Sequence, residues 1–219
     1  MITTSPRGKE GGGSVVVHAG QVKLEGTLII PEGAIGIVAF AHGSGSSRFS
    51  PRNNFVASVL QKAKIGTLLI DLLTPAEDDI YQNRFDISLL AERLNDIVDW
   101  LGQNPETMDL PVGLFGASTG AAAAIIAAAR SGSTIKAIVS RGGRPDLALD
   151  ALASVQCPTL LIVGGKDYEV IELNERAYNR LTSKKKLEIV PGATHLFEEG
   201  NTLAVVAELA KQWFELHLS

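Results

Sequence analysis

The stretch VGLFGASTGAAAAIIAAAR, residues 112–130, joins a short apolar run directly to an alanine-rich segment that favours a helix. The junction is Gly116-Ala117-Ser118-Thr119-Gly120, which has the form G-x-S-x-G. Between a strand and a helix this pattern predicts a nucleophile elbow, in which the glycines avoid Cβ collisions and the serine stands exposed. A chain with 22 glycines can match the pattern by chance. The flanking sequence therefore has to show whether this match is a nucleophile elbow or a chance occurrence.

Further apolar runs recur on both sides of this stretch. They show little alternation of apolar and polar residues, which is typical of strands buried on both faces of a parallel sheet. Each run is followed by a polar loop and a helix-like segment, as in repeated βα units. The runs cover residues 34–42, 65–73, 111–116, 135–140, 158–165 and 186–192, and the further helices are predicted near 54–64, 87–101, 146–153, 170–181 and 203–216.

The N-terminal region has a different pattern. Residues 1–14 are rich in glycine and serine without apolar periodicity, which predicts a flexible tail. Residues 14–19 and 21–31 read as two β-like runs and predict an antiparallel hairpin at a sheet edge. We therefore predict one α/β domain over residues 15–219, with a mostly parallel sheet of about eight strands and helices on both faces. The connection after residue 140 is too short for an inserted cap domain.

The composition is that of an ordinary globular protein. Apolar residues make up 45% and charged residues 20%, with a formal net charge of −4. These values give no electrostatic reason to expect nucleic acid or a membrane surface as a partner. No apolar run reaches the roughly 20 residues of a transmembrane helix, and no secretory signal pattern is present. The lone Cys157 cannot form an internal disulfide, so we expect a soluble, cytoplasmic protein in which this cysteine is a small buried apolar residue.

A serine nucleophile needs a histidine base and a carboxylate that orients the imidazole. Asp167 and His195 each follow an apolar run, in the chain order Ser, Asp, His. Because parallel strands end at one edge of the sheet, we expect these side chains to meet Ser118 there. Two simpler interpretations stay open: Asp167 could only cap the next helix, and Asp71 is a competing acid that precedes the serine.

Acyl transfer also needs N–H donors for the oxyanion of the intermediate. One candidate is the N–H of Thr119, directly after the serine, and the other is that of Ser44 in the glycine-rich loop after residues 34–42. His42 precedes this loop. We expect its ring to hydrogen-bond the backbone and shape the loop, since the mechanism has no task for a second base.

Four motifs together resemble the α/β-hydrolase superfamily: AHGSGSS (41–47), GLFGASTG (113–120), VGGKD (163–167) and PGATHLFEE (191–199). The small, lidless chain is similar to the dienelactone hydrolase-like branch, which includes hydrolases fused to phosphoribosyltransferase domains. The resemblance implies an α/β-hydrolase fold with Ser118 as nucleophile, Asp167 as acid and His195 as base, and no metal or organic cofactor. Dienelactone hydrolases proper carry cysteine at the elbow, so the serine shifts the expected substrate to ordinary carboxylic esters.

Four arginines follow the expected strand ends: Arg48, Arg52, Arg141 and Arg144. They could pair with nearby carboxylates, or they could bind an anionic group of the substrate through their bidentate guanidinium. The predicted function is a serine esterase for small, short-chain soluble esters, acting as a monomer or homodimer. Two alternatives stay open: an acyltransferase or perhydrolase with the same triad, and a catalytically silent binding protein on this scaffold.

Overall fold

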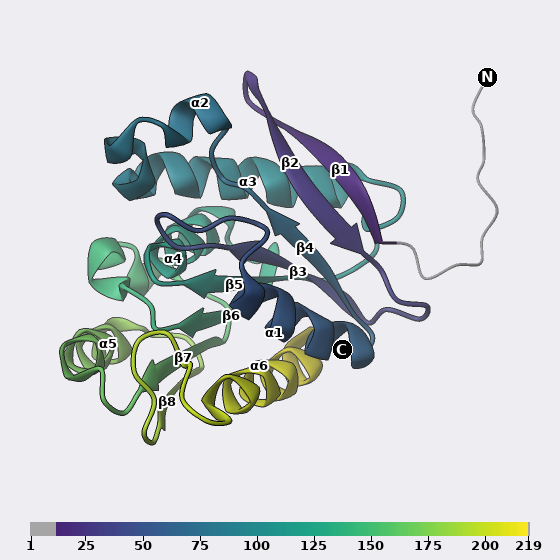
Figure 1. Ribbon diagram of the computed structural model, residues 1–219. Coiled ribbons are helices and arrows are strands. Elements are labelled where there is room, and N and C mark those ends of the chain that lie inside the picture. Colours follow the sequence, from purple (N-terminus) through teal and green to yellow (C-terminus); the bar gives the residue numbers. More distant parts are fainter. Residues whose placement is uncertain (1–11, 219) are drawn as a thin grey trace, which may run out of the picture.

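An eight-stranded sheet forms the centre of the protein, and the computed structural model describes residues 12–218 (Figure 1). The order across the sheet is β1-β2-β4-β3-β5-β6-β7-β8. β2 pairs antiparallel with β1 and β4, and the remaining neighbours pair parallel. The predicted sheet with its N-terminal hairpin is confirmed. The strands are β1 Gly12–Ala19, β2 Val22–Ile29, β3 Gly36–Ala41, β4 Ile65–Ile70, β5 Val112–Ala117, β6 Ile135–Arg141, β7 Thr159–Gly164 and β8 Lys185–Val190.

The first strand starts earlier than its side chains indicate. β1 begins at Gly12, where Gly12, Gly13 and Ser14 pair with Ile29, Leu28 and Thr27 of β2. This pairing uses backbone groups alone, so it leaves no apolar pattern in the sequence. Residues 1–11 of the expected tail lie outside the described residues.

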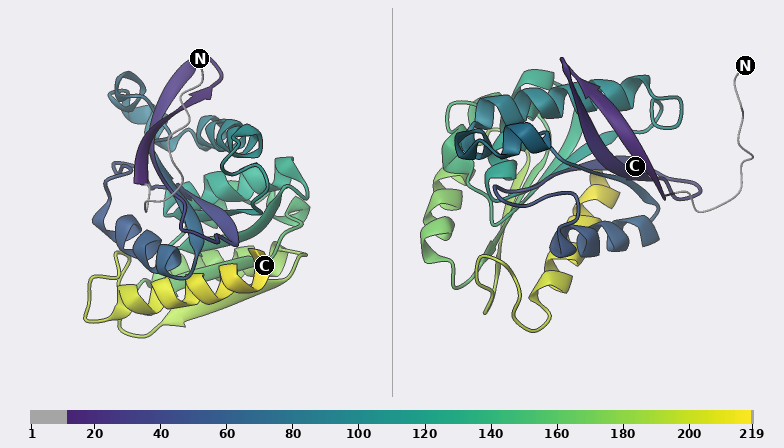
Figure 2. Two further views of the ribbon diagram at one scale, coloured as in Figure 1. Left: turned by 90° about the vertical axis from the view of Figure 1, so that its right-hand side faces the viewer. Right: turned by 45° about the horizontal axis from the view of Figure 1, so that its top comes forward.

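Helices cover both faces of the sheet (Figure 2). One face packs against α3 Ile87–Gln103, α4 Thr119–Ser131 and α5 Tyr168–Arg180, and the other against α1 Pro51–Lys62 and α6 Thr202–Leu218. Successive strand residues serve opposite cores: Val38 and Phe40 pack with α1 and α6, whereas Ala39 packs on the α3–α4 side. Because both faces are covered, β3, β4, β5 and β7 are buried at every position.

Two short segments differ from the expectation. The predicted helix at 146–153 is wrong: the chain forms two 3₁₀ turns, Pro145–Ala148 and Leu152–Ser154. So short a segment gains few α-helical hydrogen bonds, and isolated single turns favour 3₁₀ geometry. After β4 the chain also forms α2 Pro75–Asp78 and a 3₁₀ turn Tyr81–Phe85, which were not predicted. The signal for α2 is the capping box formed by Thr74 and Glu77.

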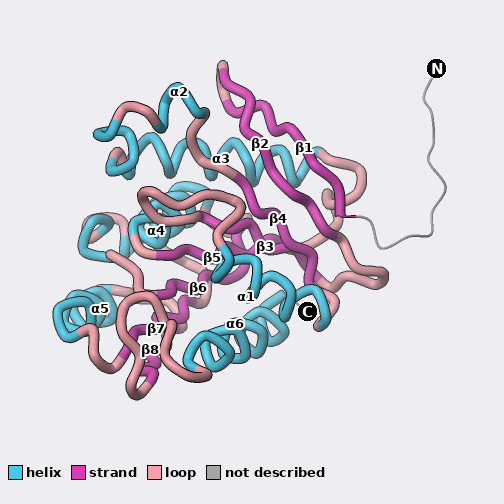
Figure 3. The backbone as a smooth tube through the Cα atoms, in the orientation of Figure 1, coloured by secondary structure: helices cyan, strands magenta, loops and turns pink. Residues whose placement is uncertain are grey.

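The loops that follow the parallel strands gather along one edge of the sheet (Figure 3). They carry the chemistry-bearing residues singled out by the sequence, and the 142–158 connection after β6 inserts only the two 3₁₀ turns. Among the described helices, none is long and apolar enough to cross a membrane.

Candidate active site

Ser118 occupies a strained turn between β5 and α4. Its backbone has φ 51° and ψ −121°, a left-handed conformation that few side chains tolerate. The turn is possible only because glycines flank it. A Cβ on Gly116 would lie 2.4 Å from the Cα of Ala121, and one on Gly120 would lie 2.2 Å from the carbonyl oxygen of Ala41. This is the geometry of a nucleophile elbow.

The imidazole of His195 is bound to Asp167. Asp167 follows β7 and His195 follows β8, and 2.7 Å separates His195 Nδ1 from Asp167 Oδ2. Asp167 stands at the N-cap of α5 but makes no side-chain capping bond, so the capping interpretation does not account for it. A carboxylate only accepts hydrogen bonds, so Nδ1 is the donor, and in the neutral imidazole the lone pair then lies on Nε2.

A cavity of about 280 Å³ lies between the turn at Ser118 and the imidazole of His195. Its walls come from the loop after β3, the start of α1, and the ends of β5 and β6. Ser118 and His195 both line it. The remaining lining residues are Gly43, Ser44, Ser46, Ser50, Arg52, Asn53, Ala117, Arg141 and Leu196.

The two expected oxyanion residues contact each other. The N–H of Ser44 donates to Thr119 Oγ1 at 2.9 Å, so this amide already has an acceptor. The structure thus brings the glycine-rich loop and the first residue of α4 together beside Ser118. Any substrate oxygen that takes the Ser44 amide must replace the threonine hydroxyl.

His42 fixes this loop through the backbone, as predicted. The N–H of Leu72 donates to His42 Nε2 at 3.3 Å, and this bond requires the proton on Nδ1. Nδ1 in turn donates to the carbonyl oxygen of Gly43 at 3.0 Å. Both ring nitrogens are therefore used in holding the start of the loop that carries Ser44.

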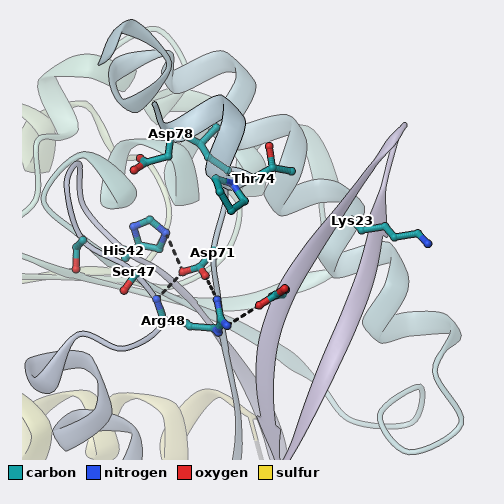
Figure 4. Close-up of a pocket in the computed structure, with 11 residues that line it drawn as sticks. Lys23, His42, Ser47, Arg48, Asp71, Thr74 and Asp78 are labelled. Atoms are coloured by element: carbon teal, nitrogen blue, oxygen red, sulfur yellow. Dashed lines mark hydrogen bonds and ion pairs between the residues drawn. The ribbon is translucent and has the colours of Figure 1, made fainter. Parts of the chain in front are cut away.

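Asp71, the competing acid, forms a hydrogen bond and an ion pair with Arg48. The carboxylate of Asp71 accepts from the backbone N–H of Arg48 at 2.7 Å and also pairs with its guanidinium. Arg48 additionally pairs with Glu25 at 2.6 Å, and His42 Nε2 lies 3.9 Å from Asp71 (Figure 4). This cluster lines a separate cavity of about 300 Å³ between the hairpin and α2. Asp167, rather than Asp71, is the acid that reaches His195.

The four arginines separate into two groups. Arg48 is paired as described, and Arg144 makes two 2.8 Å hydrogen bonds to Asp146, which raise the pKa of its guanidinium. Arg52 and Arg141 instead line the cavity with Ser118. Arg52 pairs with Glu198 at 2.6 Å. Arg141 is 7% exposed, and burial together with the charge of Arg52 lowers its pKa to about 10.

Sequence reasoning missed the contribution of α1 to this cavity. Ser50 caps the helix by accepting from the N–H of Asn53, and Pro51 stands in its first turn. A serine followed by proline is a helix-start signal that could have placed Asn53 at the edge of the site. Over residues 12–218, no three His, Cys, Asp or Glu side chains gather as a metal site would require.

The chain is similar in sequence and in fold to known hydrolases. The sequence model of the "Dienelactone hydrolase family" matches residues 59–217. The crystal structure of a dienelactone hydrolase from Anabaena variabilis ATCC 29413 has 57% sequence identity and a TM-score of 0.93, with coverage of 95% of this chain and 99% of that one. Est1E from Butyrivibrio proteoclasticus has 17% identity and a TM-score of 0.79 over 94% of this chain and 98% of its own, which shows the shared fold.

A curated relative from Mycobacterium tuberculosis (strain ATCC 25618 / H37Rv) is named "Putative phosphoribosyl transferase". It is 59% identical over 204 residues, which are 93% of this chain and 46% of the relative. The chain thus spans about half the length of the curated relatives it matches.

Proposed function

Because this chain belongs to the dienelactone hydrolase family, we propose that it is a serine hydrolase that cleaves carboxylic esters. One observation carries the proposal: Ser118, on its strained elbow, shares a cavity with His195, whose second ring nitrogen is bound to Asp167. The family supports hydrolysis in general. The serine, with an oriented imidazole in the same cavity, supports acyl transfer through a covalent intermediate.

The reaction proceeds in two balanced halves. Ser118 Oγ attacks the ester carbonyl while His195 Nε2 takes the hydroxyl proton, and Asp167 stabilises the imidazolium. The imidazolium then protonates the departing alkoxide, which leaves as an alcohol. Water attacks the acyl-enzyme in the same way, giving its proton to His195 and then releasing the carboxylic acid and Ser118.

The amides of Ser44 and Thr119 are the proposed donors to the oxyanion. Thr119 follows the nucleophile as the first residue of α4, at the positive end of the helix. The Thr119 hydroxyl holds the Ser44 amide before substrate arrives. It therefore keeps the loop close to the elbow until the developing oxyanion takes its place.

Small soluble esters suit this site best. The cavity of about 280 Å³ is small, and several of its walls are polar. The His195 side chain is 39% exposed, so water can reach the acyl-enzyme, as hydrolysis requires. We assign the phosphoribosyl transfer in the name of the M. tuberculosis relatives to the part of those proteins that this chain does not span.

Fluorophosphonate labelling tests the assignment. The wild-type protein should be labelled and should cleave short-chain esters, whereas Ser118→Ala should lose both. Ser133→Ala, in an exposed turn, is the matched control and should behave as wild type. Labelling that survives Ser118→Ala would refute the nucleophile. Labelling lost with Ser118→Ala but no ester cleaved by wild type would favour acyl transfer or a binding role.

A further inference from the structure

Arg141 is a buried cation without a countercharge among the residues that the structure describes. It ends β6, is 7% exposed and lines the cavity that holds Ser118. Within residues 12–218 no carboxylate lies within ion-pair distance of its guanidinium. Its contacts are Asn53 Oδ1 at 3.5 Å and the ring of Phe197 at 6.0 Å, and its Nε has no hydrogen-bond partner. Burying a charge in this way is costly unless a partner arrives.

A second guanidinium lies close to it. Arg52, in the first turn of α1, lines the same cavity, and its positive charge contributes to the lowered pKa of Arg141. Arg52 pairs with Glu198, whose side chain is 60% exposed and so is screened by water. The Nε of Arg52 is also buried without a partner in the described structure. The two arginines thus place positive charge at one side of the cavity.

Neutral donors complete this side of the cavity. The N-terminus of the 12-residue helix α1 lies here and adds its positive partial charge. The hydroxyl of Ser50 accepts from Asn53, so its own proton can be donated, and Ser46 adds a second hydroxyl to the lining. A carboxylate offers two oxygens and one negative charge. A phosphate monoester offers three oxygens and a charge near −2, which matches the donors and the cations better.

We propose that Arg141 and Arg52, with Ser46, Ser50 and Asn53, form a subsite for a phosphate monoester group, so that the esters cleaved at Ser118 are phosphorylated ones. This inference rests on the proposed function, because it names the substrate class of the same site. Arg48 and Arg144 take no part, since neither lines the cavity that holds Ser118 and both are paired with carboxylates elsewhere.

Phosphate binding can be measured without catalysis. Inorganic phosphate should raise the melting temperature of wild-type protein and slow fluorophosphonate labelling of Ser118. Arg141→Met should weaken phosphate binding by about tenfold to a hundredfold, the range expected for charged hydrogen bonds. Arg52→Met, at a more exposed position, should also weaken it, and Arg144→Met is the matched control that binds as wild type. Equal phosphate affinity in wild type and both cavity variants would overturn the subsite.

Matched esters then test the substrate class. The ratio of kcat/KM for a phosphorylated ester to that for its neutral counterpart should exceed about ten in wild type and fall by at least as much in Arg141→Met. A carboxylate-bearing ester that is cleaved better than the phosphorylated one would overturn the phosphate assignment. Phosphate binding without any labelling or ester cleavage would uphold the subsite and reject the proposed function. Ester cleavage without phosphate binding would uphold the proposed function and reject the subsite.

Discussion

Replacing Arg141 by methionine should raise the free energy of unfolding. Burial and the neighbouring charge of Arg52 lower the pKa of Arg141 from its usual, much higher range to about 10. Each unit of pKa difference corresponds to about 1.4 kcal/mol, so keeping this guanidinium charged in the fold costs about 3 kcal/mol. Its contacts with Asn53 at 3.5 Å and with Phe197 at 6.0 Å offset about 1 kcal/mol of that cost. Methionine fills similar space without a charge, so we expect a net gain of about 2 kcal/mol.

The pH dependence of this gain has a definite sign. The folded-state pKa of Arg141, about 10, lies below its unfolded value, so above about pH 10 the unfolded chain binds more protons than the native protein. The buried charge therefore lowers the free energy of unfolding of the wild-type protein in full below about pH 10. As the pH rises above that value, Arg141 loses its charge and the free energy of unfolding increases. The difference in free energy of unfolding between Arg141→Met and wild type should be constant near neutral pH and should disappear in alkaline solution.

Urea unfolding followed by circular dichroism measures both effects. Arg144→Met is the matched control, because that guanidinium is paired with Asp146 and is 38% exposed. Its replacement should leave stability unchanged or lower it by up to about 1 kcal/mol. An Arg141→Met protein that is less stable than wild type would show that this arginine holds the fold together, and the reasoning from its burial would be refuted.

Three further predictions follow from the site and its surroundings. Gly120→Ala should abolish activity and lower the melting temperature, because its Cβ would lie 2.2 Å from the carbonyl oxygen of Ala41. The control is Gly102→Ala, at an exposed position of α3 with open space around the Cβ, which should instead raise the free energy of unfolding in urea by about 0.5–1 kcal/mol. Asp167→Asn should lower kcat by about 10²–10⁴-fold with little change in circular dichroism, because an amide can stabilise the wrong imidazole tautomer, and unchanged kcat would contradict its role. Burial raises the pKa of the Cys157 thiol to about 11, so thiol reagents should react with it only after unfolding and should leave ester cleavage intact; rapid reaction in the native protein would contradict this placement.

Local patterns explain how much of the fold could be predicted. Unbroken apolar runs mark strands covered on both faces, and the two glycines around Ser118 mark a turn that a Cβ would block. Both signals are short-range, so they can be recognised without knowing the neighbours in space. Short segments carry weaker signals: the 146–153 region forms 3₁₀ turns instead of the predicted helix, and β1 begins at glycines, which have no side chain to form a pattern.

Parallel strand order also made part of the candidate site predictable. Strands that run the same way end at the same edge, so an acid after one strand and a histidine after the next come together, as Asp167 and His195 do at 2.7 Å. The choice between Asp167 and Asp71 still needed the structure, because both follow buried strands and only one reaches His195.

The sheet, the turn at Ser118 and the strand ends where the candidate residues gather can be recognised in the sequence, because they depend on patterns within a few residues. Which arginines pair with carboxylates depends on the folded structure. Arg48 pairs with Glu25 of the hairpin, and Arg144 with its near neighbour Asp146, whereas Arg141 pairs with no carboxylate of residues 12–218. An ion pair depends on which side chains converge in space and how deeply they are buried, and spacing along the chain carries little of that information.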